Sequence, residues 1–176
     1  MTSEWFTPVP ILERARRVLG TIDLDPASCA VANERVGAGV FHGPGGVNDD
    51  GLTAFRWCGS VWLNPPSPAL PWWARLIEAR GDVEFRHALF LAFNAELLQT
   101  SQGRSYPPIA AFPMCAPAKR IRFVRPDGTP GASPRHHSLI VYVPGTVDRR
   151  WAFCDAFADL GAVLLPGGQG ARSEAP

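Results

Sequence analysis

The chain has 176 residues, of which 46% are hydrophobic and 19% charged, and this composition predicts one folded domain and excludes a disordered chain. Seventeen basic and sixteen acidic side chains give a net charge of +1, which excludes a protein that holds nucleic acid by bulk charge alone. The first ten residues lack the pattern of a secretory signal, and no apolar run is long enough to span a membrane. We therefore expect a protein of the cytoplasm with no membrane partner.

The cysteine pattern predicts neither a disulfide framework nor a metal site. The four cysteines are far apart and form no Cys-x-x-Cys pair: Cys29, Cys58, Cys115 and Cys154. This spacing favours free thiols in a reducing compartment over disulfides or zinc ligation. Neither His42 nor His87 stands at a metal-ligand spacing from a cysteine, so no metal is expected.

The first predicted element is a helix in "PVPILERARRVLG", residues 8–20. Its apolar residues recur at the spacing of one helix face, a proline stands near its start, and Gly20 is a stop signal. Two short buried strands are predicted next, in "TIDLDPAS" (21–28) and "SVWLNPP" (60–66). Proline breaks both strands, the first after Asp25 and the second after Asn64.

The second half of the chain is predicted to be rich in strands. "HALFLAF" (87–93) is an apolar run of the kind that is buried on both faces of a sheet. Further strands are predicted in "IAAFPMCAP" (109–117), "RIRFV" (120–124) and "SLIVYVPG" (138–145), and a closing helix with a last strand in "RRWAFCDAFADLGAVLLPGG" (149–168). The domain is expected to cover residues 1–166, followed by a disordered tail at 167–176.

Strands that alternate with helices indicate an α/β fold, in which ligands bind beyond the carboxyl ends of the strands. The breaks at Asp25 and Asn64 are therefore expected to open into one crevice. Side chains that follow either strand would face a ligand there.

Four collinear segments now identify a family resemblance: "EWFTP" (4–8), "DLDPAS" (23–28), "NDDGL" (48–52) and "VWLNPP" (61–66). Together they resemble the phage-type DNA adenine-N6 methyltransferases, which are S-adenosylmethionine-dependent enzymes. The resemblance continues through "ALFLAFNAELLQ", "PMCAPAKRIRF" and "SLIVYV" and covers roughly residues 4–144. It implies a single Rossmann-like methyltransferase domain with a mostly parallel central sheet flanked by helices, in a phage or prophage setting.

The resemblance also implies where S-adenosylmethionine binds. Thr7 and Pro8 match the Thr-Pro that opens the first helix, where the hydroxyl helps to hold the methionine carboxylate; the alternative is that Thr7 is only an N-cap. Asp50 matches the acidic residue that accepts a hydrogen bond from the cofactor's adenine amine. Asp49 is a second candidate for that role, and a simple turn at "NDDG" is the alternative to both.

A loop after the first strand matches the part of the family fold that wraps the methionine moiety. Its residues are Asp25, Pro26, Ala27 and Ser28. Asp25 is placed to pair with the amino group of the cofactor, although no Gly-x-Gly follows it. The alternative is a strand-to-helix turn in which Asp25 serves as a cap.

Asn64, Pro65 and Pro66 are the predicted catalytic residues. An exocyclic base amine is a poor nucleophile because its lone pair is delocalised into the ring. The side-chain oxygen of Asn64 and the carbonyl of Pro65 would accept its two protons and orient the lone pair, which is catalysis by positioning and electrostatics. The prolines stiffen the loop and leave its carbonyls free. A strand that is merely ended by prolines is the alternative.

The chain departs from the family pattern directly after these prolines. Family members carry a tyrosine that stacks on the base flipped out of the duplex, and this chain has Ser67. Trp72 and Trp73 are candidates to replace the ring; the alternative is that they are packing residues of the next helix. Stacking of a base on an aromatic ring contributes about 1–3 kcal/mol, so the absence of the tyrosine is compatible with reduced or altered activity.

The densest positive charge lies in residues 118–139 and predicts the DNA contacts. Arg120 and Arg122 would share one face of a strand and contact phosphates, while a solvated edge strand is the alternative. Asn94 follows an apolar strand and would face the crevice, where it would contact the base or the cofactor; a simple helix start is the alternative.

These inferences predict methylation of the adenine exocyclic amine in DNA, with double-stranded DNA as the partner and no obligate protein partner. One rival hypothesis is a catalytically silent relative that binds DNA or cofactor. A second rival is an enzyme of the same scaffold that modifies another base amine, such as that of cytosine.

Overall fold

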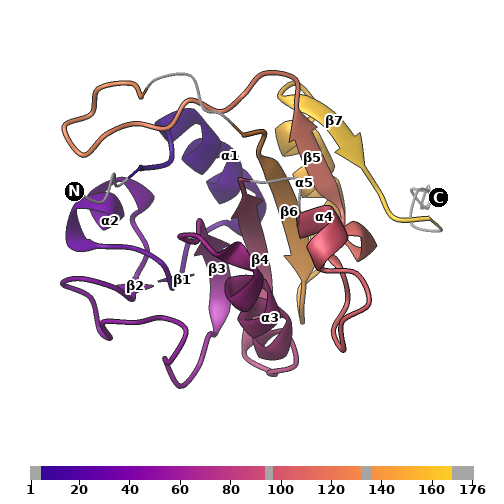
Figure 1. Ribbon diagram of the computed structural model, residues 1–176, viewed down its shortest axis with the longest axis horizontal. Coiled ribbons are helices and arrows are strands. Elements are labelled where there is room, and N and C mark those ends of the chain that lie inside the picture. The colour runs from indigo at the N-terminus through magenta and orange to yellow at the C-terminus, as the bar shows by residue number, and fades with distance from the viewer. Residues whose placement is uncertain (1–4, 94–96, 132–135, 168–176) are drawn as a thin grey trace.

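The computed structural model describes residues 5–93, 97–131 and 136–167. They form one mixed sheet of seven strands in the order β2-β1-β3-β4-β6-β5-β7, flanked by helices (Figure 1). The strands are β1 (Leu24–Asp25), β2 (Val40–Phe41), β3 (Gly59–Leu63), β4 (Phe85–Ala92), β5 (Met114–Pro117), β6 (Leu139–Pro144) and β7 (Gly161–Leu164). The predicted α/β class is confirmed.

The sheet is parallel in its first half only. β1 pairs in parallel with β2 and β3, and β3 pairs in parallel with β4. Beyond β4 every pairing is antiparallel: β6 with β4, β5 with β6, and β7 with β5. The mostly parallel sheet that we expected is therefore found only between β2 and β4. β5 lies between β6 and β7 and is antiparallel to both, so β6 and β7 run parallel to each other.

Helices cover both faces of this sheet. α1 (Val9–Leu19) and α5 (Arg150–Phe157) pack on one face, and α3 (Ala69–Ala79) and α4 (Leu97–Thr100) pack on the other (Figure 1). α2 (Ala30–Val36) follows β1. The side chains of β3 alternate between two apolar cores, with Val61 and Leu63 under α3 and Trp62 under α1. All three are 0% exposed, so β3 is closed on both faces.

The first helix confirms its sequence prediction. Its buried residues are those of the predicted apolar face: Ile11, Leu12, Ala15, Val18 and Leu19. Pro8 is the N-cap, and Gly20 ends the helix with φ +77° and donates its N–H to the carbonyl of Arg16 at 2.8 Å. The glycine is required there because an L side chain rarely adopts such a φ.

Of the two strands predicted in residues 109–117 and 120–124, the first forms only at its end, as β5 (Met114–Pro117), and the second does not form. Residues 109–111 form a 3-10 helix, η1 (Ile109–Ala111), which begins after Pro108 and ends before Pro113. In the segment 120–124 only Val124 makes bridges, to Phe6 and to Pro130. The expected alternation survives without a ladder, since Arg120 and Arg122 are exposed and Ile121 is buried.

The remaining predictions for the ends of the chain meet mixed outcomes. The closing helix and last strand are confirmed as α5 and β7. The tail predicted at 167–176 lies outside the described residues except for Gly167. No helix in the described part of the chain is long and apolar enough to cross a membrane.

A buried polar network ties the middle strands together. His87 on β4 is 0% exposed, and its ring nitrogens lie 3.3 Å from the hydroxyl of Tyr142 and 3.2 Å from the hydroxyl of Ser60. Burial lowers the pKa of His87 to about 4, so the ring is neutral at pH 7. The Tyr142 hydroxyl also accepts the N–H of Arg149 at 2.5 Å. The polar atoms of this network have partners, as a stable core requires.

We predict that Gly59→Ala destabilises the start of β3. Gly59 has φ +74°, and a Cβ there would lie 2.6 Å from the Cβ of Asp23, whose carboxylate accepts the N–H of Ser60 at 2.7 Å. The matched control is Gly103→Ala, at φ +65° with nothing within 4 Å. Urea denaturation should show a loss about 1–3 kcal/mol larger for Gly59→Ala, because steric overlap adds to the φ penalty. Equal losses for the two variants would contradict this packing argument.

Candidate functional site

A large cavity opens where the carboxyl ends of β1 and β3 meet. Its volume is about 1180 Å³. The lining comes from residues 5–7, from the loop 25–29 and α2, from residues 42–44 and 49–51, from Trp62, residues 64–67 and Trp72, and from Phe93, Phe123, His136 and Ser138. The two proline breaks of the sequence therefore open into one crevice, as predicted.

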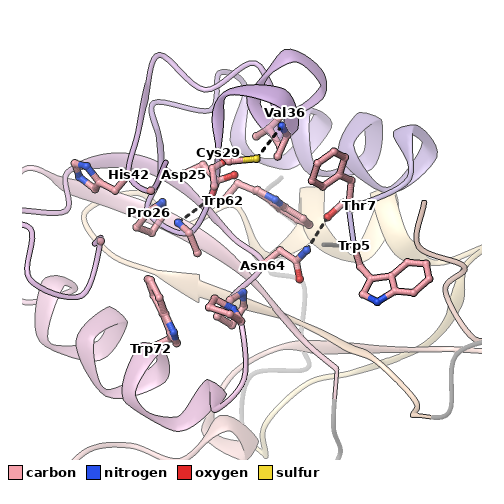
Figure 2. Close-up of a pocket in the computed structure, with 18 of the residues that line it drawn as sticks. Trp5, Thr7, Asp25, Pro26, Cys29, Val36, His42, Trp62, Asn64 and Trp72 are labelled. Atoms are coloured by element: carbon pink, nitrogen blue, oxygen red, sulfur yellow. Dashed lines mark hydrogen bonds between the residues drawn. The ribbon is translucent and has the colours of Figure 1, made fainter. Parts of the chain in front are cut away.

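Asn64 lines this cavity, and its side-chain oxygen is an acceptor without a hydrogen-bond partner among the described residues. Its side-chain nitrogen donates to the hydroxyl of Thr7 at 3.2 Å, which fixes the orientation of the amide (Figure 2). Its Oδ1 is buried and has no hydrogen-bond partner among the described residues. A buried acceptor without a partner costs about 1–3 kcal/mol, so the site is built for a donor that the protein itself does not provide.

Other residues that line the cavity also carry buried polar atoms without a partner. Trp62 Nε1 and Ser138 Oγ are among them, and neither has a partner within the described part of the chain. An indole N–H, a hydroxyl and an amide oxygen thus belong to residues around one space. Such a set fits a polar ligand or ordered water, because both satisfy donors and acceptors at once.

Asp25 is a buried carboxyl at the end of β1. It is 2% exposed, and its Oδ1 accepts the N–H of Ala27 at 3.1 Å, as in a turn cap. Loss of hydration raises the pKa of Asp25 to about 7. The hydrogen bond from Ala27 acts in the opposite direction and lowers this pKa, but its effect is smaller. Among the ion pairs of the described residues none involves Asp25. A cationic ligand group would stabilise its charged form.

Glycines that sequence reasoning did not assign shape the same wall. A Cβ on Gly51 would collide with the carbonyl of Pro26, and a Cβ on Gly43 would collide with the carbonyl of Ser28. These close backbone approaches hold the loop after β1 against the loops after β2. The signal in the sequence was the glycine cluster in "FHGPGGVNDDG", residues 41–51.

The other predicted cofactor residues have mixed surroundings. Pro26, Ala27 and Ser28 line the cavity with Asp25. Asp50 also lines the cavity and is exposed. Its Oδ1 accepts the N–H of Leu52 at 2.9 Å, so Asp50 forms the turn that was the alternative interpretation, and this turn does not exclude contact with a ligand. Thr7 is buried next to Asn64 and is not an N-cap, because Pro8 holds that position. Pro8 is not among the lining residues.

The aromatic candidates separate clearly. Trp72 lines the cavity and stacks on Trp57 with ring centroids 6.1 Å apart. Trp73 is 0% exposed, packs edge-on against Phe90 and Phe112, and donates its indole N–H to the carbonyl of Pro107 at 3.1 Å. The expectation that Trp73 contacts DNA is therefore wrong, because α3 turns that side chain into the core.

The remaining predicted residues lie at or beyond the rim. Pro65 and Pro66 line the cavity, Pro65 buried and Pro66 exposed, and Ser67 is exposed beside them. Arg120 and Arg122 are exposed and are not among the lining residues. Asn94 lies outside the described residues.

The lining residues that sequence reasoning missed include His42, Arg35 and Trp5. His42 is 4% exposed, directly follows β2, and lies 3.2 Å from the side-chain nitrogen of Asn48; burial lowers the pKa of its imidazole. Arg35 places its guanidinium 5.9 Å from the ring centroid of Phe6. Trp5 is 42% exposed. Only the position of His42 directly after a strand could have been read from the sequence.

Searches of this chain against protein-family models, curated proteins and solved structures found no match. Within residues 5–93, 97–131 and 136–167, no group of three or more His, Cys, Asp or Glu side chains could hold a metal ion. The chemistry of the cavity lining is therefore the basis for the functional proposal.

We predict that Asp25→Asn stabilises the protein in a pH-dependent way. The pKa of Asp25 is about 7 in the folded chain and about 4 in the unfolded chain, so the folded state binds the extra proton between these values. The contribution of Asp25 to the stability of the wild-type protein therefore falls as pH rises from 4 to 7, whereas the amide has no such titration. The advantage of Asp25→Asn should grow over this window to at most about 4 kcal/mol and stay level above it.

Thermal or urea unfolding from pH 4 to pH 8.5 measures the difference. Asp50→Asn, at an exposed carboxyl in the same cavity, is the matched control and should show no comparable trend. An advantage of Asp25→Asn that does not change with pH would refute the buried, uncompensated carboxyl.

Proposed function

We propose that the protein is an S-adenosylmethionine-dependent methyltransferase that acts on the exocyclic N6 amine of adenine in DNA. The observation that carries the proposal is the buried, unpartnered Oδ1 of Asn64, a residue that lines a large cavity at the carboxyl end of β3. An amine N–H is the kind of group that this oxygen accepts. The sequence resemblance to phage-type adenine methyltransferases supplies the identity of the amine.

Asn64 and Pro65 act on the amine together. Oδ1 of Asn64 accepts one N–H, and the carbonyl of Pro65, which is followed by a proline, accepts the other. The two hydrogen bonds hold the nitrogen lone pair away from the ring and aim it at the methyl donor. The nitrogen would bond to the methyl carbon as the carbon–sulfur bond of the sulfonium breaks and leaves a neutral thioether, and the nitrogen would lose one proton to water. Thr7 keeps the acceptor in place before the substrate arrives, since its hydroxyl already binds the Asn64 amide.

The lining of the cavity fits the cofactor. Asp25 is a buried carboxyl without a cationic partner in the described chain, which suits the ammonium of a methionine moiety. The hydroxyl of Thr7 accepts from Asn64 and keeps its own proton to donate to a carboxylate. Asp50 would accept from the adenine amine at the exposed end of the same cavity. When bound, S-adenosylmethionine supplies a methyl group on a sulfonium.

DNA would be held outside the cavity. Arg120 and Arg122 are exposed and follow β5, and in Figure 1 the chain after β5 crosses the top of the view toward α2. Their guanidinium groups suit phosphate oxygens, which position a duplex without reading its sequence. A shallow phosphate contact of this kind fits a chain with a net charge of +1.

One observation favours a second candidate. Ser67 is exposed at the position where the family carries a stacking tyrosine, so the chain has lost a ring there. A relative that binds cofactor and DNA without transferring the methyl group would tolerate this loss. A changed base amine, such as that of cytosine, would tolerate it too.

The deciding experiment is nucleoside mass spectrometry of unmethylated DNA after incubation with the protein and S-adenosylmethionine. We expect N6-methyladenine with the wild-type chain and none with Asn64→Ala, while calorimetry shows that Asn64→Ala still binds the cofactor. Methylcytosine would change the substrate and keep the site. Unchanged DNA, with cofactor binding intact, would replace the proposal with the silent relative.

We also predict that Thr7→Val slows methyl transfer. The valine has the shape of threonine but cannot accept from the Asn64 amide, so Oδ1 is no longer held toward the amine. One hydrogen bond of about 1 kcal/mol corresponds to a loss of roughly five- to tenfold in single-turnover rate. Thr7→Ser keeps the hydroxyl and should retain most of the rate. Equal rates for the two variants would count against a positioning role for Thr7.

A further inference from the structure

Trp5 is the most exposed of the tryptophan and phenylalanine side chains that line the cavity. It is 42% exposed, whereas Phe6, Trp62 and Trp72 are 6%, 0% and 7% exposed and Phe93 and Phe123 are half-buried. An exposed indole leaves a large apolar face in water, and this costs free energy unless a ligand covers it. The position of Trp5 therefore calls for a ligand that has an apolar face.

The backbone directs Trp5 to the same side as the Asn64 acceptor. Phe6 and Val124 exchange two backbone hydrogen bonds, at 2.8 and 3.0 Å, so the N-terminal segment is extended there. Side chains two residues apart in an extended segment lie on one side, which groups Trp5 with Thr7. Thr7 binds Asn64, and Figure 2 draws the Asn64 amide between the rings of Trp72 and Trp5.

The ring of Trp5 is held in place by the segment that follows Phe123. A Cβ on Gly131 would collide with Cζ3 of Trp5, so the indole packs directly on this glycine. The guanidinium of Arg125 lies 6.0 Å from the ring centroid of Trp5. A ring fixed before binding loses little conformational entropy when a ligand stacks on it.

The rival ring is less available. Trp72 lines the cavity but is 7% exposed and already stacks on Trp57. Its replacement would also remove core packing. Ser67 offers no ring at all, although it is exposed at the rim.

We propose that Trp5 is the platform on which the target base stacks, in place of the ring that Ser67 lacks. The identity of that base as adenine rests on the proposed function, whereas stacking itself requires only an unpaired nucleobase with its planar face. Arg125, whose guanidinium lies over the ring of Trp5, adds a positive charge that suits a phosphate of the bound strand. Trp5 thus contributes to substrate binding and not to cofactor binding.

Fluorescence anisotropy with two end-labelled single strands tests the proposal. One probe is an oligodeoxyadenylate, whose bases need no extrusion from a duplex, and the other is an abasic strand of equal length and charge. Trp5→Leu should weaken binding of the adenine strand about 5- to 150-fold and leave the abasic strand unchanged. Trp5→Phe keeps a ring and should stay near the wild-type affinity.

Three results would overturn the stacking role. They are equal losses on both strands with Trp5→Leu, no loss on either strand, and a wild-type protein that binds the adenine strand no better than the abasic one. Calorimetric titration with S-adenosylmethionine separates the two proposals, because Trp5→Leu should bind the cofactor as the wild type does. A base preference that Trp5→Leu abolishes supports the platform even if no methyl transfer is found, and that combination would overturn the proposed reaction alone.

Discussion

Val61, Trp62 and Leu63 of β3 are each fully buried, because α1 and α5 cover one face of the sheet and α3 covers the other. A strand closed on both faces and paired along both edges has backbone polar groups free for a ligand only where it ends. The parallel pairing of β1 with β3 brings a second strand end to the same place. The cavity, the acceptor of Asn64 and the carboxyl of Asp25 all follow from this arrangement, since prolines end the two strands there.

Burial shifts the pKa values of His87 and Asp25 in this sheet toward the neutral forms, with different consequences. His87 is neutral inside a network in which Ser60 and Tyr142 provide partners, so its burial serves the stability of the fold. Asp25 is buried with one backbone hydrogen bond and no cation in the described chain. Buried polar groups that form hydrogen bonds within the protein stabilise the fold. Buried polar groups without such a partner indicate a ligand-binding site. By this criterion His87 belongs to the structural core of the protein, and Asp25 belongs to its candidate binding site.

Local patterns in the sequence were enough for most elements and for the centre of the site. Apolar spacing with Gly20 as a stop predicted α1, and the proline breaks predicted that Asp25 and Asn64 would meet. The order and direction of β4 to β7 depend on pairing between distant segments, which no local pattern encodes. The environment of a ring is equally non-local: Trp72 and Trp73 are adjacent, yet one reaches the cavity and the other lies in the core. The exposure of Trp5 depends on Gly131, which is far away in the sequence.

The pairing of β4 with β6 affects how long a hydrophobic strand edge stays exposed while the chain is being synthesised. β4 is apolar and long, and one of its edges pairs with β3, whose residues 59–63 are synthesised before it. Its other edge pairs with β6, whose residues 139–144 are synthesised much later. Until then the nascent chain exposes an open, hydrophobic strand edge, which is a template for pairing with other chains. Translation pauses between these two strands would therefore lengthen the period of exposure to aggregation, and a chaperone that covers strand edges would act at that stage.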